Sequence, residues 1–335
     1  QILLLWCGEM DLFESIVHSL GTAGTGGFGV KGDSIVSYSP YIQWVITIFM
    51  LIFGVNFNIY YLILVRKIRT AFKSEELWVY LGIVAAAVGI ITYNVYHLFG
   101  NFWEALRQSA FQVASIISTT GYSTTDFNLW PMFAKCVLVL LMFIGACAGS
   151  TGGGLKVSRV MLVGKSVGRE LKRLIHPRSV GVIRLEGKRV EESVVQSATA
   201  YVALYFLLFG GALLLLCLEP AFDFESNFTA VAACINNVGP GLGAVGPTGS
   251  YADYGVLSKL VLSLSMLLGR LEIYPLVLAL LIGAIYLLVR KIISWHPPAA
   301  FIGTVFLFSW LLHGEFSYAV CQILSGGLML GAFFM

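Results

Sequence analysis

The sequence predicts an all-α polytopic membrane protein built from repeated units of a short helix, a glycine-containing segment and a long helix. Two of the supporting observations concern composition: 58% of the 335 residues are hydrophobic and only 12% are charged, values outside the range of ordinary soluble domains. The third is repetition, because this unit occurs three times at intervals of about 100 residues. A chain that repeats one such unit can surround a central axis.

Each unit begins with a short stretch that enters the membrane without crossing it and ends with a helix of membrane length. The short stretches are expected at 12–20, 103–117 and 224–235, and the long helices from about residues 41, 131 and 254. The first long helix is expected to be a full span that ends at residue 65, and two further spans, 77–99 and 194–217, connect the units. Re-entrant segments are tolerated only where protein or a water-filled cavity surrounds them.

The glycine-containing segments have the composition of an ion filter. The central one reads Ser118-Thr119-Thr120-Gly121-Tyr122-Ser123, and Thr and Gly allow consecutive backbone carbonyls to point inward and replace the water around a cation. The alternative is an ordinary Thr/Gly turn between two membrane helices; the two further copies favour the filter. The predicted filter residues are Thr25, Gly26, Gly27, Phe28, Thr119, Thr120, Gly121, Tyr122, Asn236, Asn237, Val238 and Gly239.

Glycine interrupts the long helix that begins near residue 131. Residues 145–154 include five glycines, and each Gly destabilises a helix by about 1 kcal/mol relative to Ala, so the helix is expected to break here. Unwound backbone persists inside a bilayer only beside a cavity, so this loop is expected to line the conduction path below the filter, where it could act as a movable gate. The alternative is a glycine-packed helix crossing.

Basic residues gather in three regions of the chain. Residues 66–73, 156–189 and 290–291 contain 16 of the 21 Lys and Arg residues, so the positive-inside rule places them in the cytoplasm. The opposite side carries the glycine-containing segments and has eleven carboxylates against four bases, which favours cations over anions at that mouth. Topology alone accounts for part of this imbalance. The connection 156–189 suits either anionic lipid headgroups or an acidic cytosolic partner.

A basic residue lies near the middle of the last long helix. Charge inside a membrane is costly, so Arg270 is expected to face the path or a partner, and it could hold the glycine-rich loop through hydrogen bonds to carbonyls. A local pair with Glu272, or snorkelling toward the inner surface, is the alternative.

No pattern in the sequence indicates an enzyme, a metal site or nucleic-acid binding. The six cysteines are scattered through apolar segments without a CxxC pair and are expected to be buried small hydrophobes. Gly164-Lys165-Ser166 lacks the preceding glycine of a phosphate loop. The glycine triplets within 24–29 and 241–246 match a dinucleotide fingerprint, yet neither follows a strand.

These motifs resemble the membrane subunit of the Trk/Ktr/HKT superfamily of potassium transporters, most closely its Trk type. The resemblance covers residue 1 to about residue 276. It rests on the three filter segments, on Ala148-Gly149-Ser150-Thr151-Gly152-Gly153-Gly154-Leu155-Lys156, on His176-Pro177-Arg178 and on Gly269-Arg270-Leu271-Glu272-Ile273-Tyr274-Pro275. It implies a single-chain pseudo-tetramer of four helix, pore-helix, helix units around one ion path, in the bacterial inner membrane.

The resemblance also implies a function, potassium uptake through a filter whose glycines are Gly27, Gly121 and Gly239. The gate would comprise Gly149, Ser150, Thr151, Gly152, Gly153, Gly154, Lys156 and Arg270, and K⁺ would bind the carbonyls of Thr25, Gly26, Thr119, Thr120, Asn237 and Val238. A homodimer regulated by a cytosolic nucleotide-binding subunit would follow. ATP or NAD is expected only on that partner, and no cofactor on this chain.

Two features depart from that family. Only three of the four filter repeats are present, so the first is expected upstream of Gln1. The tail, 280–335, is similar instead to the flavin-carrying membrane subunit of Rnf/Nqr electron-transport complexes, although their flavin-attachment motif is absent. The expected domains are three pore repeats, 1–73, 74–189 and 190–279, and a two-helix tail, 280–335. A fragment or fusion related to an electron-transport complex is the alternative function.

Overall fold

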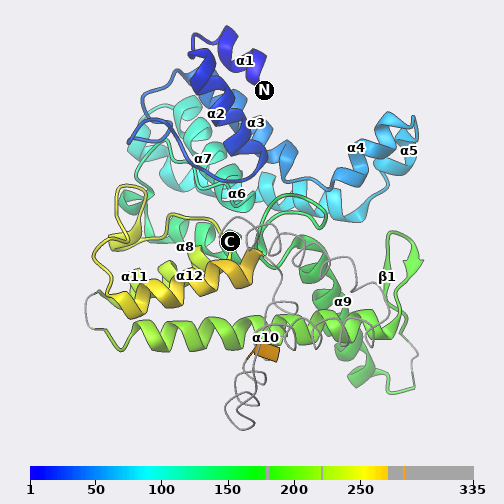
Figure 1. Cartoon of the computed structure of the whole chain (residues 1–335). Coiled ribbons are helices and arrows are strands. Elements are labelled where there is room, and N and C mark those ends of the chain that lie inside the picture. Colours follow the sequence, from blue (N-terminus) through cyan, green and yellow to red (C-terminus); the bar gives the residue numbers. More distant parts are fainter. Residues whose placement is uncertain (179–180, 220–221, 271–281, 284–335) are drawn as a thin grey trace, which may run out of the picture. The chain divides into compact units, whose positions relative to one another are not determined.

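The computed structural model describes residues 1–178, 181–219, 222–270 and 282–283 (Figure 1). The chain divides into two compact units, Gln1–Arg270 and Leu271–Met335, and the elements described here belong to the first. Glu272 and, apart from residues 282–283, the predicted tail 280–335 lie outside the described residues.

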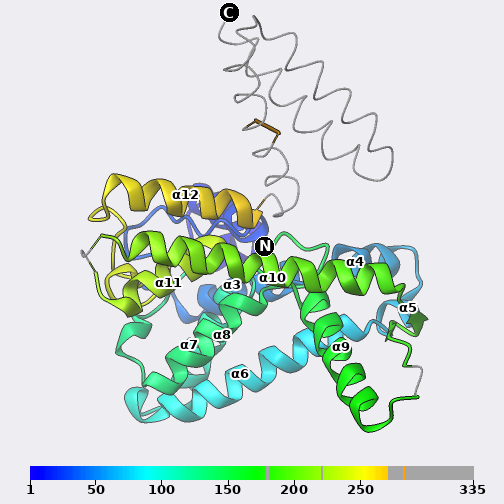
Figure 2. The same cartoon turned by 90° about the horizontal axis from the view of Figure 1, so that it is seen from below.

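Helices form most of the regular structure in the described part of the first unit, and loops connect them (Figures 1 and 2). The other elements described are a small antiparallel hairpin, β1 (Arg184–Leu185) and β2 (Lys188–Arg189), and two turns of 3-10 helix, η1 (Phe127–Leu129) and η2 (Gly243–Val245). The α-helices are α1 (Ile2–Cys7), α2 (Leu12–Ala23), α3 (Pro40–Phe53), α4 (Phe57–Leu64), α5 (Ile68–Ala71), α6 (Glu75–Phe99), α7 (Phe102–Ile117), α8 (Met132–Ile144), α9 (Val157–Ile175), α10 (Glu192–Leu216), α11 (Phe224–Ile235) and α12 (Val256–Arg270).

The three short helices expected before the filter segments are α2, α7 and α11. Each begins at an Asp or Asn whose side chain accepts a backbone N–H of the first turn: Asp11 from Phe13, Asn101 from Trp103 and Asp223 from Ser226. Such caps satisfy donors that a helix start otherwise leaves without partners. The central short helix, α7, packs against α3, α6 and α8, so it lies within the core of the unit.

Among the residues that the structure describes, two helices, α6 and α10, are long and apolar enough to cross a membrane, as expected for 77–99 and 194–217. The pair α3 and α4 would count as a third span if taken together, and α8 is a shorter apolar helix. The break expected after α8 is present, because α8 ends at Ile144 and α9 begins only at Val157.

The segment expected to be one full span from residue 41 to residue 65 is not a single helix. The chain bends by 89° between α3 and α4. Gly54 ends α3, and the Asn56 side chain accepts the N–H of Asn58 to begin α4. The groups freed by the bend bond the glycine-rich loop: Gly54 C=O accepts from the N–H of Cys147 (3.0 Å), and the N–H of Phe57 donates to Gly149 C=O (3.1 Å). A tertiary contact that periodicity cannot reveal therefore stabilises the break.

The expectation that the cysteines are buried is wrong for three of them. Cys7, Cys136 and Cys217 are exposed on helix surfaces, whereas Cys147 and Cys234 are buried, and all five are free thiols. A lipid-facing surface is apolar, so an apolar sequence context does not by itself indicate burial in protein. Cys321 lies outside the described residues.

Candidate functional site: three glycine-containing segments and the loop that contacts them

The three glycine-containing segments, 24–29, 118–123 and 236–241, begin with the same backbone turn, in which an N–H just past each short helix bonds a carbonyl five residues earlier. The bonds run from Gly26 to Gly21 (2.8 Å), from Thr120 to Ser115 (2.9 Å) and from Val238 to Ala233 (2.8 Å). This is the helix ending of a Schellman motif, which places one residue in the left-handed region. Here that residue is Thr25, Thr119 or Asn237, with φ of 50°, 59° and 55°.

The glycine two residues further along each segment is also left-handed. Gly27, Gly121 and Gly239 have φ of 68°, 85° and 102°, values that residues with a Cβ rarely adopt. The three segments therefore share a backbone course as well as a composition, which an unrelated set of Thr/Gly turns would not.

Neighbouring segments are in contact through these glycines. A Cβ atom added at Gly27 would overlap the carbonyl oxygen of Thr120, and one added at Gly121 would overlap the carbonyl oxygen of Val238. The first segment thus lies beside the second and the second beside the third. Nothing lies within 4 Å of a Cβ placed at Gly239.

The burial of the segments also indicates that the second one lies between the first and the third. Thr119 and Thr120 of the central segment are 0% and 1% exposed, whereas Phe28 of the first segment is 80% exposed. The outer two segments each leave one side open within the part of the chain that the structure describes.

Three side chains of the predicted filter residues, those of Tyr122, Asn236 and Asn237, bond to surrounding protein. Tyr122 is buried and its hydroxyl donates to the Phe28 carbonyl (3.1 Å). The Asn236 Oδ1 accepts from the Tyr205 hydroxyl (2.9 Å) and the Asn237 Nδ2 donates to the Met266 carbonyl (3.1 Å). These side-chain bonds hold the segments in place.

The glycine-rich loop contacts all three segments. The Thr25 hydroxyl donates to the Thr151 carbonyl (3.1 Å), and the N–H of Gly153 donates to the Thr119 hydroxyl (2.7 Å). A Cβ on Gly153 would overlap the carbonyl oxygen of Asn236. The tip of the loop, 151–153, therefore lies against the point where each short helix ends.

Arg270, at the end of α12, bridges the loop and the first segment. Its Nη1 donates to the Thr151 carbonyl (3.0 Å) and to the Thr25 hydroxyl (3.2 Å), and its Nη2 donates to the Gly24 carbonyl (3.1 Å). The Gly24 carbonyl lies at the C-terminal end of α2, where the helix dipole favours a cation. The expected hydrogen bond from Arg270 to the loop is present.

Two residues that hold the base of the loop were not predicted. The Ala148 N–H donates to the carboxylate of Glu76 (2.7 Å), which is 5% exposed at the start of α6. Asn56, at the bend between α3 and α4, lies against Gly149. An acidic residue just inside an apolar span is the one signal in the sequence that could have identified Glu76. Lys156 ends the loop as the N-cap of α9, with a φ of 72°.

Removing the Thr119 hydroxyl is expected to destabilise the contact between loop and filter. Thr119→Val keeps the size and branching of the side chain but leaves the buried N–H of Gly153 without its acceptor, which costs about 1–3 kcal/mol. We expect a melting temperature several degrees lower for the purified protein, measured by intrinsic fluorescence. Thr119→Ser, which keeps the hydroxyl, should melt close to the unaltered chain; equal loss in both variants would contradict the assignment.

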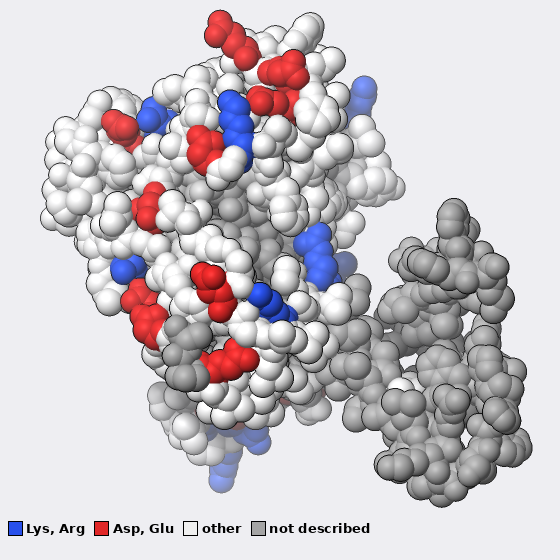
Figure 3. All heavy atoms as spheres, turned by 60° about the vertical axis from the view of Figure 1, so that its left-hand side comes forward, with Lys and Arg blue, Asp and Glu red and all other residues white. Residues whose placement is uncertain are grey.

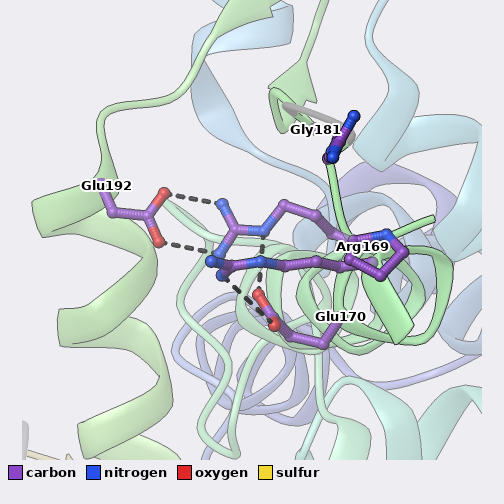
Figure 4. A pocket seen from close by; sticks show the side chains of 7 residues that line it. Arg169, Glu170, Gly181 and Glu192 are labelled. Carbon is purple, nitrogen blue, oxygen red and sulfur yellow. Dashed lines mark hydrogen bonds and ion pairs between the residues drawn. The ribbon is translucent and has the colours of Figure 1, made fainter. Parts of the chain in front are cut away.

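Away from the three glycine-containing segments, a polar pocket of about 380 Å³ lies between α9 and the start of α10. Figure 4 shows the Arg169 guanidinium pointing at Glu192, with bonds of 2.6 and 2.8 Å. The lining residues are Arg169, Glu170, Arg173, Pro177, Arg178, Gly181 and Glu192. The predicted basic connection 156–189 is therefore not a plain loop, since α9 and the hairpin build a surface on it.

Carboxylates and bases share the face drawn in Figure 3, with red side chains spread around it. Ion pairs neutralise two of the bases assigned to the outer side, since Lys135 lies 3.3 Å from Glu225 and Arg107 lies 3.5 Å from Glu104. No group of three or more His, Cys, Asp or Glu residues able to hold a metal ion occurs among the residues described.

Three short helices, each ending in a matched glycine-containing segment, with neighbouring segments in contact, are typical of helical membrane transporters. Residues 6–284 match the family model described as "TrkH: Cation transport protein". The chain belongs to the TrkH family. It is a multi-pass protein of the bacterial inner membrane and belongs to a family of transporters, not of enzymes.

Individual relatives agree with this membership. The chain is 37% identical over 279 residues to the Trk system potassium uptake protein TrkH of Salmonella typhimurium, covering 82% of this chain and 57% of that protein. It is 33% identical over 272 residues to TrkG of Escherichia coli, covering 80% and 56%. The crystal structure of the potassium transporter TrkH from Vibrio parahaemolyticus superposes with a TM-score of 0.78 at 35% identity, covering 83% of this chain and 60% of that one. The chain thus spans a little over half the length of these relatives.

Proposed function

We propose that this chain forms the filter and gate of a K⁺ uptake pathway. The observation that carries the proposal is the set of three segments with one backbone course, in contact through Gly27 and Gly121. A filter needs consecutive carbonyls around one axis, and adjacent segments of this form can supply them. The relatives named potassium uptake proteins support K⁺ as the ion.

In this proposal, K⁺ binds the backbone carbonyls of the three segments. The ligands are those of Thr25, Gly26, Thr119, Thr120, Asn237 and Val238. Support comes from the neighbouring arrangement of these segments and from side chains that bond elsewhere, such as those of Asn236 and Asn237. The third segment has Asn and Val where the second has Thr, so its share of the ring differs chemically.

The loop 149–154, with Lys156 and Arg270, acts as the gate. The tip of the loop contacts the end of each short helix, and Arg270 holds it to the first segment. A loop held by a few hydrogen bonds can leave this position at modest cost, because each bond contributes only about 0.5–3 kcal/mol. Movement of the tip would open or close the path directly beneath the filter.

The three repeats, 1–73, 74–189 and 190–279, form three sides of the path, and a fourth unit completes it between the first and third segments. The exposed Phe28 and the open space beside Gly239 support this arrangement. The longer curated relatives are consistent with it.

The same proposal includes two partners, a second copy of the chain and a cytosolic nucleotide-binding subunit that carries ATP or NAD. The names of the relatives place them in a "Trk system". The pocket at α9 contributes three arginines to the side expected to face the cytoplasm, where an acidic partner or anionic lipid headgroups would meet it.

Ion uptake by the chain tests the proposal. We expect that the chain, expressed together with the fourth unit in bacteria that lack their own K⁺ uptake systems, restores uptake of K⁺ and of radioactive rubidium, with Na⁺ a poor competitor. A protein that inserts into the membrane yet gives no uptake would contradict it. The electron-transport alternative predicts covalent flavin instead, so a yellow, fluorescent purified protein would favour that reading.

A further inference from the structure

A buried chain of polar groups lies behind the first two filter segments. It starts at Glu14 on α2, whose Oε2 accepts from the Tyr38 hydroxyl (3.0 Å). The Tyr38 hydroxyl lies 3.3 Å from Nε2 of His18, and Nδ1 of His18 lies 3.3 Å from the Tyr122 hydroxyl. Tyr122 in turn donates to the carbonyl of Phe28. The chain thus runs from a carboxylate on α2 to the backbone of the first filter segment.

The surroundings hold these groups tightly. His18 and Tyr122 are both 0% exposed. A Cβ on Gly21 would lie 2.5 Å from the Tyr122 hydroxyl, and one on Gly29 would lie 3.2 Å from Cε1 of His18. Glycines at these positions allow the rings to approach the filter segment, so the contacts follow from close packing.

This hydrogen-bonded network has one hydrogen too few when its histidine is neutral and its carboxylate is ionised. Four contacts link Glu14, Tyr38, His18, Tyr122 and the Phe28 carbonyl, and each needs one hydrogen. An ionised carboxylate supplies none, each tyrosine supplies one, and a neutral imidazole supplies one. Three hydrogens cannot make four bonds. One further proton, on His18 or on Glu14, completes the set.

The missing hydrogen decides how Phe28 is held. If neutral His18 carries its proton on Nε2, Nδ1 must accept from Tyr122, and Tyr122 then has no hydrogen for the Phe28 carbonyl. If it carries its proton on Nδ1, the bond between Tyr38 and Glu14 is lost instead. Only the protonated set satisfies every contact at once and keeps the Phe28 carbonyl bonded to Tyr122 without exception.

We propose that this network binds one proton, and that the bound proton fixes the first filter segment through the Tyr122 bond to the Phe28 carbonyl. His18 is then a positioning residue for the filter and makes ion selectivity dependent on external pH. The inference deepens the proposed function and rests on it for its effect on transport, but the proton count depends only on the geometry.

Burial, two charged groups and a neighbouring tyrosine set the protonation of His18. Burial is the largest influence and disfavours the imidazolium; Glu14, on the same helix, favours it, and Lys31, from the following loop, opposes it. Lys31 also lies over the Tyr38 ring, 4.2 Å from its centre. Burial, followed by the hydrogen bond to Glu14 and the charges of Glu14 and Asp33, raises the pKa of Tyr38 above its usual range, so Tyr38 keeps its single hydrogen at any physiological pH. Tyr122 faces the ring from the second segment.

The test measures the ratio of rubidium to sodium uptake between about pH 5 and pH 8, a range that spans the ordinary pKa of histidine. We expect the ratio to be about threefold higher at the acidic end, as one hydrogen bond would produce. Glu14→Gln and His18→Gln each provide an amide that donates without titrating, so both should give a flat profile. Tyr122→Phe should be flat as well, with a low ratio throughout. His97→Gln, at an exposed histidine of α6, should retain the pH dependence.

Two outcomes would overturn the inference. One is a flat profile in the unaltered chain that nevertheless takes up K⁺, which leaves the proposed function standing. The other comes from ¹⁵N spectra of histidine-labelled protein, in which the His18 signal is identified by its loss in His18→Gln. We expect two protonated ring nitrogens at acidic pH and one at alkaline pH. A ring that stays neutral across the range, with Glu14→Gln leaving the pH profile intact, would contradict the proton count whether or not the chain transports ions.

Discussion

Gly121→Ser is expected to abolish K⁺ uptake while leaving the protein in the membrane. Gly121 has a φ of 85°, which a residue with a Cβ adopts only with strain, and the added Cβ would overlap the Val238 carbonyl oxygen of the next segment. Relief of that overlap must move either the second or the third segment out of position. We expect uptake in bacteria to fall by about tenfold or more, because ion coordination depends on the placement of several carbonyls together.

Gly89→Ser is the matched control. Gly89 lies within α6, and nothing lies within 4 Å of a Cβ placed there, so the same change of residue should leave uptake near that of the unaltered chain. Membrane content of both variants is measured by immunoblot. Normal uptake by Gly121→Ser at normal membrane content would remove Gly121 from the filter.

Arg270→Ala is expected to change gating rather than ion preference. The substitution removes three hydrogen bonds, two to the first segment and one to Thr151 of the loop. Bonds from a charged donor contribute about 1.5–3 kcal/mol each, so the loop should leave the filter far more often. We expect the maximal rate of K⁺ uptake to rise at least about twofold, with little change in the K⁺ concentration that gives half-maximal uptake.

Lys259→Ala provides the comparison on the same helix. The side chain of Lys259 also donates to a carbonyl, that of Ala252. Lys259 is near the start of α12, however, whereas Arg270 is at its end. Its removal should leave the maximal rate unchanged. A maximal rate that falls in Arg270→Ala, or that rises equally in both variants, would contradict the role of Arg270 as a holder of the gate.

The sequence predicts the helices and their order well because membrane helices are specified locally. The short helices α7 and α11 end at the expected residues, Ile117 and Ile235, since an Asp or Asn cap and a following Thr, Asn or Gly mark both ends. The loop after α8 was also predictable, because five glycines in ten residues cannot sustain a helix. Membership of the TrkH family confirms the resemblance drawn from these motifs.

Long-range contacts were beyond such reasoning. The bend at Gly54 and Asn56 depends on hydrogen bonds with residues 147–149, which lie some ninety positions away in the chain. These bonds supply the partners that backbone groups freed by the bend require. In the sequence, Glu76 resembles an ordinary acidic residue at the start of a helix. Only the structure shows that its carboxylate accepts the N–H of Ala148 in the glycine-rich loop. His18 and Tyr38 lie in segments whose local pattern says nothing of Tyr122, so only the packing of the filter segments brings the three together.

The most direct test of the filter is a crystal structure of the protein grown with thallium or rubidium in place of K⁺, read from anomalous scattering. We expect peaks on the axis between the three segments, within coordination distance of the carbonyls of Thr25, Thr119, Thr120 and Val238. Peaks only elsewhere, or none between the segments in a protein that takes up K⁺, would contradict it.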